Sequence, residues 1–137
     1  MGQVFRVEQP IRFSYCDPAG IVYFPQFFDL MNGLLEDWFT AGLSVSYPDM
    51  IMNQRLGTPT LDIQCEFIKP CRYGEILTLE LRVTRLGRSS FHLAEQGIVG
   101  GETRWRSRHV LCFMSNDSYR AVPIPEAVRA KMATFLA

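Results

Sequence analysis

The stretch PQFFDLMNGLLEDWFTAG, residues 25–42, predicts the one long helix of this chain and thereby its fold. Proline is favoured at the first position of a helix, and Gly42 is a suitable end because glycine adopts the backbone angles found beyond a helix terminus. Phe28, Leu30 and Phe39 make the apolar surface wider than that of a surface helix, so we expect another element to cover most of it. The residues at helical spacing are Phe27, Met31, Leu34, Leu35 and Trp38.

Alternating apolar and polar residues predict strands on both sides of this helix. One strand is expected at residues 4–14, and four more follow the helix at residues 61–69, 76–85, 91–99 and 104–115. The joints between the later strands are short, and Gly100-Gly101 suits a two-residue hairpin, so the sheet is predicted to be antiparallel. Residues 43–59 are expected to be a loop with one helical turn, and residues 123–136 a closing helix.

The predicted order of elements defines an α+β fold. Strands of about ten residues extend for about 33 Å, which is long enough to curl around a helix of four turns. We therefore expect a single domain, residues 1–137, in which a curved antiparallel sheet of about five strands wraps a long central helix and a short helix ends the chain.

Composition excludes several classes of protein. Fourteen basic residues balance fourteen acidic residues, so no net charge attracts the molecule to nucleic acid or to an anionic membrane. We found no secretion signal and no apolar stretch of membrane-spanning length, which predicts a cytoplasmic protein. The four cysteines have neither the spacing nor the histidine partners of a metal site, so we expect reduced thiols and no metal.

Common catalytic motifs are absent, including the G-x-S-x-G serine elbow, the phosphate-binding loops and the H-E-x-x-H zinc motif. His92 and His109 lie in the middle of predicted strands without an obvious acid or thiol partner, and we interpret both as structural histidines. Arg104, Arg106 and Arg108 share one face of a strand, which predicts a solvated face.

The stretch DPAGIVYFP, residues 17–25, closely resembles the signature of the 4-hydroxybenzoyl-CoA thioesterase family of hotdog-fold enzymes. Three further segments occur in that family's order, so the resemblance covers nearly the whole chain; they are residues 57–59 (GTP), 88–91 (RSSF) and 120–125 (RAVPIP). The resemblance implies a hotdog fold and hydrolysis of an acyl-CoA thioester. Coenzyme A is then part of the substrate, and no separate cofactor is expected.

The chemistry of such a site can be stated from the residues at the start of the helix. Backbone N–H groups at a helix N-terminus are preorganised to bind the negative oxygen that forms when a thioester is attacked. By resemblance, Asp17 is the nucleophile or the general base, the backbone N–H of Phe24 is the main oxyanion donor, and Gly20 keeps the approach clear. The alternative for Asp17 is an ordinary Asp-Pro turn.

The resemblance also implies substrate-binding residues, which include Tyr23 and Thr58. Asn32 occupies the position where the family's 4-hydroxybenzoyl enzyme has a carboxylate that accepts a hydrogen bond from the ring hydroxyl, and an amide is a weaker acceptor. The acyl group therefore stays open between hydroxylated aroyl, benzoyl and short acyl groups, and Asn32 is equally well explained as a solvated residue of the helix. For the phosphates of CoA, the family uses the corner that here contains Arg88, Ser89 and Ser90, and Arg129 and Lys131 are further candidates.

Hotdog domains pair edge to edge, and this family forms tetramers, so we expect at least a homodimer with residues from both chains in each site. A thioesterase is the main prediction. A module that binds an acyl-CoA or an acyl-carrier protein without cleaving it is the alternative. A hotdog dehydratase is disfavoured, because that chemistry generally needs a histidine near the helix start.

Overall fold

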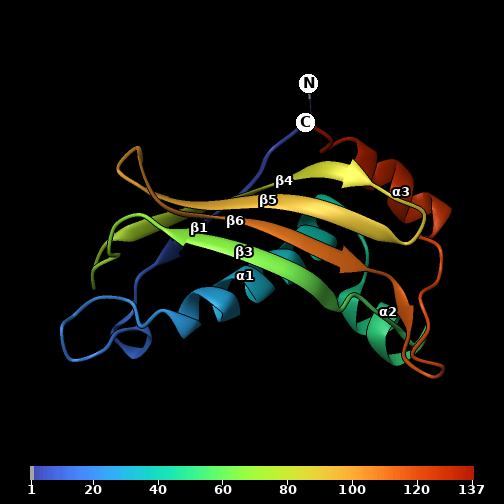
Figure 1. The fold of residues 1–137 in the computed structure, drawn as a ribbon, viewed down its shortest axis with the longest axis horizontal. Helices are drawn as coiled ribbons and strands as arrows, with labels where there is room; N and C mark the ends of the chain where they lie inside the picture. Colours follow the sequence, from blue (N-terminus) through green and yellow to red (C-terminus); the bar gives the residue numbers. More distant parts are fainter. Residues whose placement is uncertain (1) are drawn as a thin grey trace.

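The computed structural model describes residues 2–137 and confirms the predicted order of the main elements (Figure 1). A short 3-10 turn (Phe13–Tyr15) precedes the long helix, and a π-helical turn (Trp38–Gly42) extends it. The named elements are β1 (Phe5–Pro10), α1 (Pro25–Asp37), α2 (Tyr47–Met52), β2 (Leu56–Gly57), β3 (Thr60–Phe67), β4 (Ile76–Leu86), β5 (Ser90–Val99), β6 (Glu102–Cys112), β7 (Met114–Ser115) and α3 (Glu126–Ala133).

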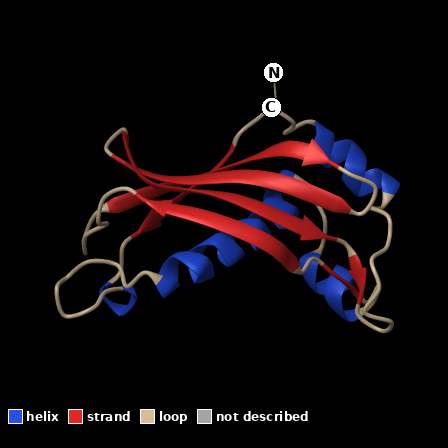
Figure 2. Cartoon of the chain, viewed as in Figure 1, coloured by secondary structure: helices blue, strands red, loops and turns tan. Residues whose placement is uncertain are grey.

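The main sheet has five strands in the order β1-β4-β5-β6-β3, and every neighbouring pair is antiparallel (Figure 2). Strands β2 and β7 form a separate small pair. Gly100 and Gly101 join β5 to β6 with φ angles of 57° and 79°. Two consecutive positive φ angles are typical of the predicted two-residue hairpin, and glycine adopts them without strain.

The sheet curves over α1 (Figure 1), and most of the apolar side of this helix is buried. Phe28 is an exception to the predicted wide apolar surface, because its side chain is exposed. The ring of Phe27 lies 5.6 Å from that of Trp105 in β6, and Trp38 lies 6.4 Å from Phe91 in β5. Each large apolar side chain removed from water in this way contributes about 1.5–3 kcal/mol. The opposite side of α1, which contains Asp29 and Asn32, is exposed as the sequence predicts.

Some predicted boundaries were wrong, and proline explains them. The first strand ends at Pro10 rather than residue 14. The predicted helical turn in the loop after α1 is the six-residue helix α2, and the Ser46 hydroxyl accepts a hydrogen bond from the Asp49 N–H at its start. The last helix begins only at Glu126, after prolines that cannot donate backbone hydrogen bonds.

Strand β3 is a free edge of the sheet, as β1 is at the other side. Leu61, Phe67 and the following Ile68 are all exposed along β3. A free edge presents unpaired N–H and C=O groups, and natural proteins usually block such edges with charge, proline or a covering element. An edge of eight residues that also exposes large apolar side chains is suited to pairing with another strand.

Two glycines provide a matched test of packing. A Cβ added at Gly97 would lie 2.4 Å from Nε1 of the buried Trp105, whereas a Cβ at Gly33 on the exposed side of α1 meets nothing within 4 Å. We predict that Gly97→Ala lowers the free energy of unfolding by about 1–3 kcal/mol. Gly33→Ala should raise it by about 0.5–1 kcal/mol, because alanine is the better helix former. Urea denaturation measures both, and equal effects would contradict the packing shown here.

Candidate active site

Asp17 begins a tight turn that is closed by backbone hydrogen bonds. Its N–H donates to the carbonyl of Ile21 at 3.0 Å, and its carbonyl accepts from the N–H of Gly20 at 2.9 Å. Its carboxylate accepts from the N–H of Ala19 at 2.8 Å, which fixes the direction of the side chain. Gly20 has a φ of 78° with open space beside it, so this position needs glycine for its backbone angle.

The turn leads directly into α1, and Phe24 is the residue that precedes the helix. The N–H of Tyr23 donates to the carbonyl of Tyr15, and the N–H of Gln26 donates to the carbonyl of Tyr23. Within residues 2–137, the N–H of Phe24 has no hydrogen-bond acceptor, and Pro25 has no N–H at all. Phe24 therefore offers a backbone donor at the positive end of the helix dipole.

The loop between β3 and β4 holds the Asp17 turn against the sheet. The N–H of Val22 donates to the carbonyl of Cys71 at 2.8 Å, and the N–H of Tyr73 donates to the carbonyl of Gly20 at 2.9 Å. Because these bonds come from the loop of residues 70–75, the position of the turn depends on the shape of that loop.

Arg104 and Glu75 fix that loop through a bidentate ion pair. Both guanidinium–carboxylate contacts are 3.0 Å long, and Arg104 also donates to the carbonyl of Pro70 at 2.6 Å. The prediction of a solvated face was wrong for Arg104, whose side chain is only 13% exposed, while Arg106 and Arg108 are exposed as predicted. The sequence could not reveal this role, since the partner lies 29 residues away.

These contacts shift the pKa values of the groups around the turn. The hydrogen bond from Arg104 lowers the pKa of Glu75, and the same bond raises the pKa of Arg104. Burial, and then the charge of Asp17, raise the pKa of the Cys16 thiol. Burial raises the pKa of Cys71 to about 11. Both thiols are thus protonated at neutral pH, and neither is an activated thiolate.

A second group of the predicted site residues lies at the other end of the sheet. Ser90 pairs with Cys112 across β5 and β6, and the N–H of Cys112 donates to the carbonyl of Pro59, beside Thr58. Ser89 and Arg88 belong to the same corner, which follows β4. The eleven residues of β4 extend for about 36 Å, so this corner is remote from the Asp17 turn of the same chain.

Two features of this second group bear on ligand binding. The Thr58 hydroxyl is buried, and within residues 2–137 it has no hydrogen-bond partner. Such groups are rare in native proteins unless water or a ligand satisfies them. The Arg88 side chain is exposed, whereas Arg129 donates to the carbonyls of Gly87 and Arg88 and so braces the corner. Lys131 is exposed on α3.

Asn32 lies between the two groups, on the exposed side of α1, and Tyr23 is exposed at the helix start. Asn32 lies seven positions after Pro25 in the helix, which is about 10 Å along the axis. Asp17, Gly20 and Tyr23 therefore belong to one hairpin that leads to Phe24 at the start of α1, and within one chain this hairpin is remote from the Arg88 corner.

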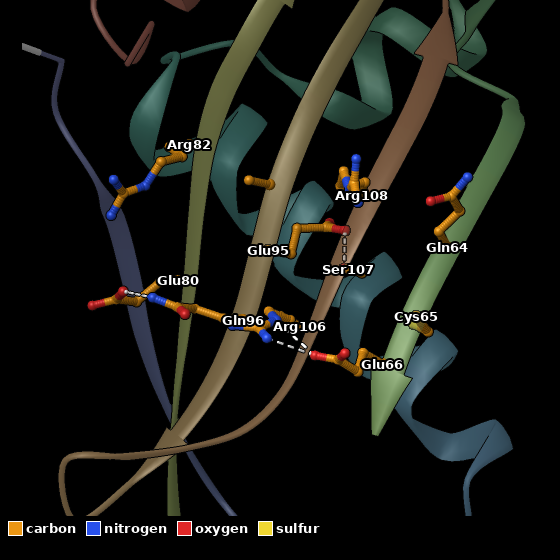
Figure 3. Close-up of a pocket in the computed structure, with 11 residues that line it drawn as sticks. Gln64, Cys65, Glu66, Glu80, Arg82, Glu95, Gln96, Arg106, Ser107 and Arg108 are labelled. Carbon is orange, nitrogen blue, oxygen red and sulfur yellow. Dashed lines mark hydrogen bonds and ion pairs between the residues drawn. The ribbon is translucent and has the colours of Figure 1, made fainter. Parts of the chain in front are cut away.

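A groove of about 700 Å³ lies elsewhere, on the face of the sheet that points away from α1 (Figure 3). Within its lining, Arg106 donates to Glu66 at 2.8 Å, and the amide of Gln96 donates to Glu80 at 2.8 Å. None of the site residues predicted from the sequence lines this groove. We therefore centre the candidate active site on the Asp17 turn.

His109 has an acid partner that sequence reasoning missed. Its Nδ1 lies 3.2 Å from a carboxylate oxygen of Glu95 in the neighbouring strand, and its Nε2 lies 2.7 Å from the Thr60 hydroxyl. Glu95 is 14 residues distant in sequence, so only the pairing of β5 with β6 makes the contact visible. Within residues 2–137, no three metal-binding side chains come together, and no helix is long and apolar enough to cross a membrane.

Comparison with known proteins identifies the class. The model of the family described as "Thioesterase-like superfamily" matches residues 11–132. The hotdog architecture, the Asp17 turn and this match together define a thioester hydrolase of the hotdog class. The chain belongs to the thioesterase-like superfamily.

Three similar proteins illustrate the family. The chain is 28% identical to a 4-hydroxybenzoyl-CoA thioesterase of Pseudomonas sp. (strain CBS-3), over 91% of this chain and 94% of that one. It is 29% identical to a 1,4-dihydroxy-2-naphthoyl-CoA hydrolase of Thermosynechococcus vestitus, over 90% of this chain and 84% of that one. The fold matches the crystal structure of an aspartate-to-asparagine mutant of 4-hydroxybenzoyl-CoA thioesterase complexed with 4-hydroxybenzoyl-CoA. The TM-score is 0.86 and the identity 23%, and the match covers 94% of this chain and 98% of that one.

The ion pair that fixes the 70–75 loop predicts acid sensitivity. Because the pKa of Glu75 is lowered from its ordinary 4.5 in the folded protein, its contribution to stability is complete above that value and is lost as pH falls through the folded-state pKa. Glu75→Gln should lower the free energy of unfolding by about 1–3 kcal/mol at pH 7.

The difference between parent and Glu75→Gln should shrink below about pH 4.5, as urea denaturation at several pH values measures. Glu66→Gln removes an exposed carboxylate and is the control. A difference that stays constant from pH 7 to pH 3 would contradict this role of Glu75.

Proposed function

We propose that this protein hydrolyses an aroyl-CoA thioester to the free acid and CoA, with Asp17 as the residue that carries out the chemistry. The observation that carries the proposal is the fixed carboxylate of Asp17 in the hairpin that leads to Phe24, whose N–H has no acceptor within residues 2–137. Membership of the thioesterase-like superfamily and the acyl-CoA hydrolases among its relatives support the reaction class.

In the proposed mechanism, the thioester carbonyl oxygen accepts a hydrogen bond from the Phe24 N–H. This donor stabilises the negative charge that develops on the oxygen, aided by the helix dipole. Asp17 either attacks the carbonyl carbon to form an anhydride, which water then hydrolyses, or removes a proton from the attacking water. Both routes release CoA and the free acid.

We further propose that two copies of the chain build each complete site. The Arg88 corner and Thr58 lie far from Asp17 within one chain, but antiparallel pairing of two β3 edges would bring opposite ends of two sheets together. The exposed Leu61 and Phe67 on β3 favour such pairing. A ligand held between the copies would also satisfy the buried Thr58 hydroxyl. Assembly of two dimers into a tetramer stays a prediction.

For the acyl group, we propose an aromatic acid. The relatives named above act on hydroxybenzoyl and dihydroxynaphthoyl thioesters. The aromatic rings of Phe24, Phe27 and Phe67 form a cluster at the helix start. The ring centroid of Phe67 lies 6.4 Å from that of Phe24 and 5.5 Å from that of Phe27. Stacked or edge-on contacts with such rings favour an aromatic acyl group over an aliphatic one of similar size.

Asp17→Asn tests the chemistry. We predict that this variant loses at least about 100-fold in kcat, because an amide can neither attack nor remove a proton. Release of the CoA thiol would be followed for benzoyl-CoA, hydroxybenzoyl-CoA isomers and 1,4-dihydroxy-2-naphthoyl-CoA. Asp29→Asn on the exposed side of α1 is the matched control.

Turnover that survives Asp17→Asn would remove Asp17 from the mechanism. Binding of acyl-CoA without turnover in either protein would instead support a non-catalytic module that binds acyl-CoA or an acyl-carrier protein.

Complementation tests the shared site. We expect Asp17→Asn and Arg88→Ala each to lower kcat/KM, and we expect partial recovery when the two variants are unfolded and refolded together. Half of the resulting dimers would be mixed, each with one intact site, which gives about a quarter of the parent's sites. If Asp17 and Arg88 of the same chain formed each site, mixing would restore nothing.

A further inference from the structure

The buried polar chain of Glu95, His109 and Thr60 is the feature that the proposed mechanism does not use. The Glu95 side chain is 0% exposed and lies on the side of the sheet that faces α1. Its carboxylate accepts from the Ser107 hydroxyl at 3.0 Å and contacts His109 Nδ1 at 3.2 Å. A carboxylate in a core is costly unless hydrogen bonds satisfy it, so its presence here calls for a role.

The direction of these hydrogen bonds depends on the tautomer of His109. We assign the tautomer in which Nδ1 carries the proton that points to the Glu95 carboxylate. In that tautomer Nε2 is an acceptor, and the Thr60 hydroxyl donates its single proton to it over 2.7 Å. Thr60 Oγ1 then has only lone pairs to offer, and it acts as an acceptor toward any further partner.

Thr60 presents this oxygen at the free edge of the sheet. It is exposed and is the first residue of β3, whereas His109 behind it is buried. The next residue, Leu61, has no partner in the register with β6, so the edge is bulged beside Thr60. Bulges of this kind often re-aim a side chain next to a functional site.

The position of Thr60 along β3 links it to the site of a second copy. Thr60 and Phe67 are the two ends of β3, and seven residue steps separate them by about 23 Å, so Thr60 is remote from the helix start of its own chain. Antiparallel pairing of two β3 strands over their whole length would set Thr60 opposite Phe67 of the second copy. Within each chain, Phe67 packs on Phe24 and Phe27.

We propose that Thr60 is a specificity-determining residue that accepts a hydrogen bond from a ring hydroxyl of the acyl group bound at the second copy's helix start. His109 and Glu95 are positioning residues that hold the Thr60 proton away from the substrate. This inference rests on the proposed function. The thioesters named for the relatives carry ring hydroxyls, and here Asn32 supplies an amide rather than a carboxylate as the other acceptor.

The test compares hydroxylated and unsubstituted substrates. The values of kcat/KM for benzoyl-CoA and for its 2-, 3- and 4-hydroxy derivatives would be measured for the parent, Thr60→Val and Thr60→Ser. Thr60→Val should lower the preference for the best hydroxylated substrate over benzoyl-CoA about tenfold, because a site built to bind a hydroxyl discriminates strongly against its absence. Thr60→Ser should restore the preference, and His109→Gln should lower it.

Thr84→Val is the matched control, since the Thr84 hydroxyl donates to a backbone carbonyl on β5 and should leave the preference unchanged. The inference would be overturned if Thr60→Val lowered kcat/KM equally for benzoyl-CoA and its hydroxy derivatives. It would also be overturned if the preference for the hydroxylated substrate did not change. Thr60→Val alters a surface methyl-sized group, so the outcome does not depend on whether the core variant His109→Gln folds.

Dissociation constants of the same thioesters in the Asp17→Asn background separate this inference from the proposed function. Selective binding of the hydroxylated thioester that depends on Thr60 supports the inference even if Asp17 proves unnecessary for turnover. Selective binding of the hydroxylated thioester that does not depend on Thr60 overturns the inference, even if Asp17 is the catalytic residue. Failure to bind any of the thioesters overturns it as well.

Discussion

Burial of α1 against the curved sheet is the interaction on which the rest of the structure depends. The helix contributes Phe27, Met31, Leu34, Leu35 and Trp38 to the core, and their transfer from water outweighs any single polar contact in the molecule. Because the sheet covers only one side, the start of the helix stays open at the end of the sheet. The same packing that stabilises the fold therefore leaves an accessible N-terminus with a free backbone donor.

The Asp17 turn has little packing of its own, and its position comes from the neighbouring loop. Arg104 and Glu75 fix residues 70–75, and that loop binds the backbone of Gly20 and Val22. The pair is largely shielded from water, so it is stronger than an exposed ion pair would be. The carboxylate that we propose for the chemistry is thus held through a loop fixed to the sheet, which suits the preorganisation that catalysis needs.

The core also contains a polar chain that stability alone does not explain. Glu95, Ser107 and His109 occupy inward-facing positions that apolar residues could fill, and replacing such buried polar groups with apolar ones is often neutral or stabilising. The chain ends at Thr60 on the free edge, where a second copy would meet it. In the proposed dimer, joining two sheets along β3 gives a role both to this polar chain and to the remote Arg88 corner.

The sequence by itself determined the local conformations, including the turn at Asp17. Helical spacing predicted α1, alternation predicted the strands, and Gly100-Gly101 predicted the hairpin, because each depends on neighbouring residues alone. Which distant residues meet was decided only by the tertiary structure. Arg104 finds Glu75, and His109 finds Glu95, through the register and curvature of strands that are far apart in sequence. Strand register follows from packing of the whole inner face, and no local pattern records it.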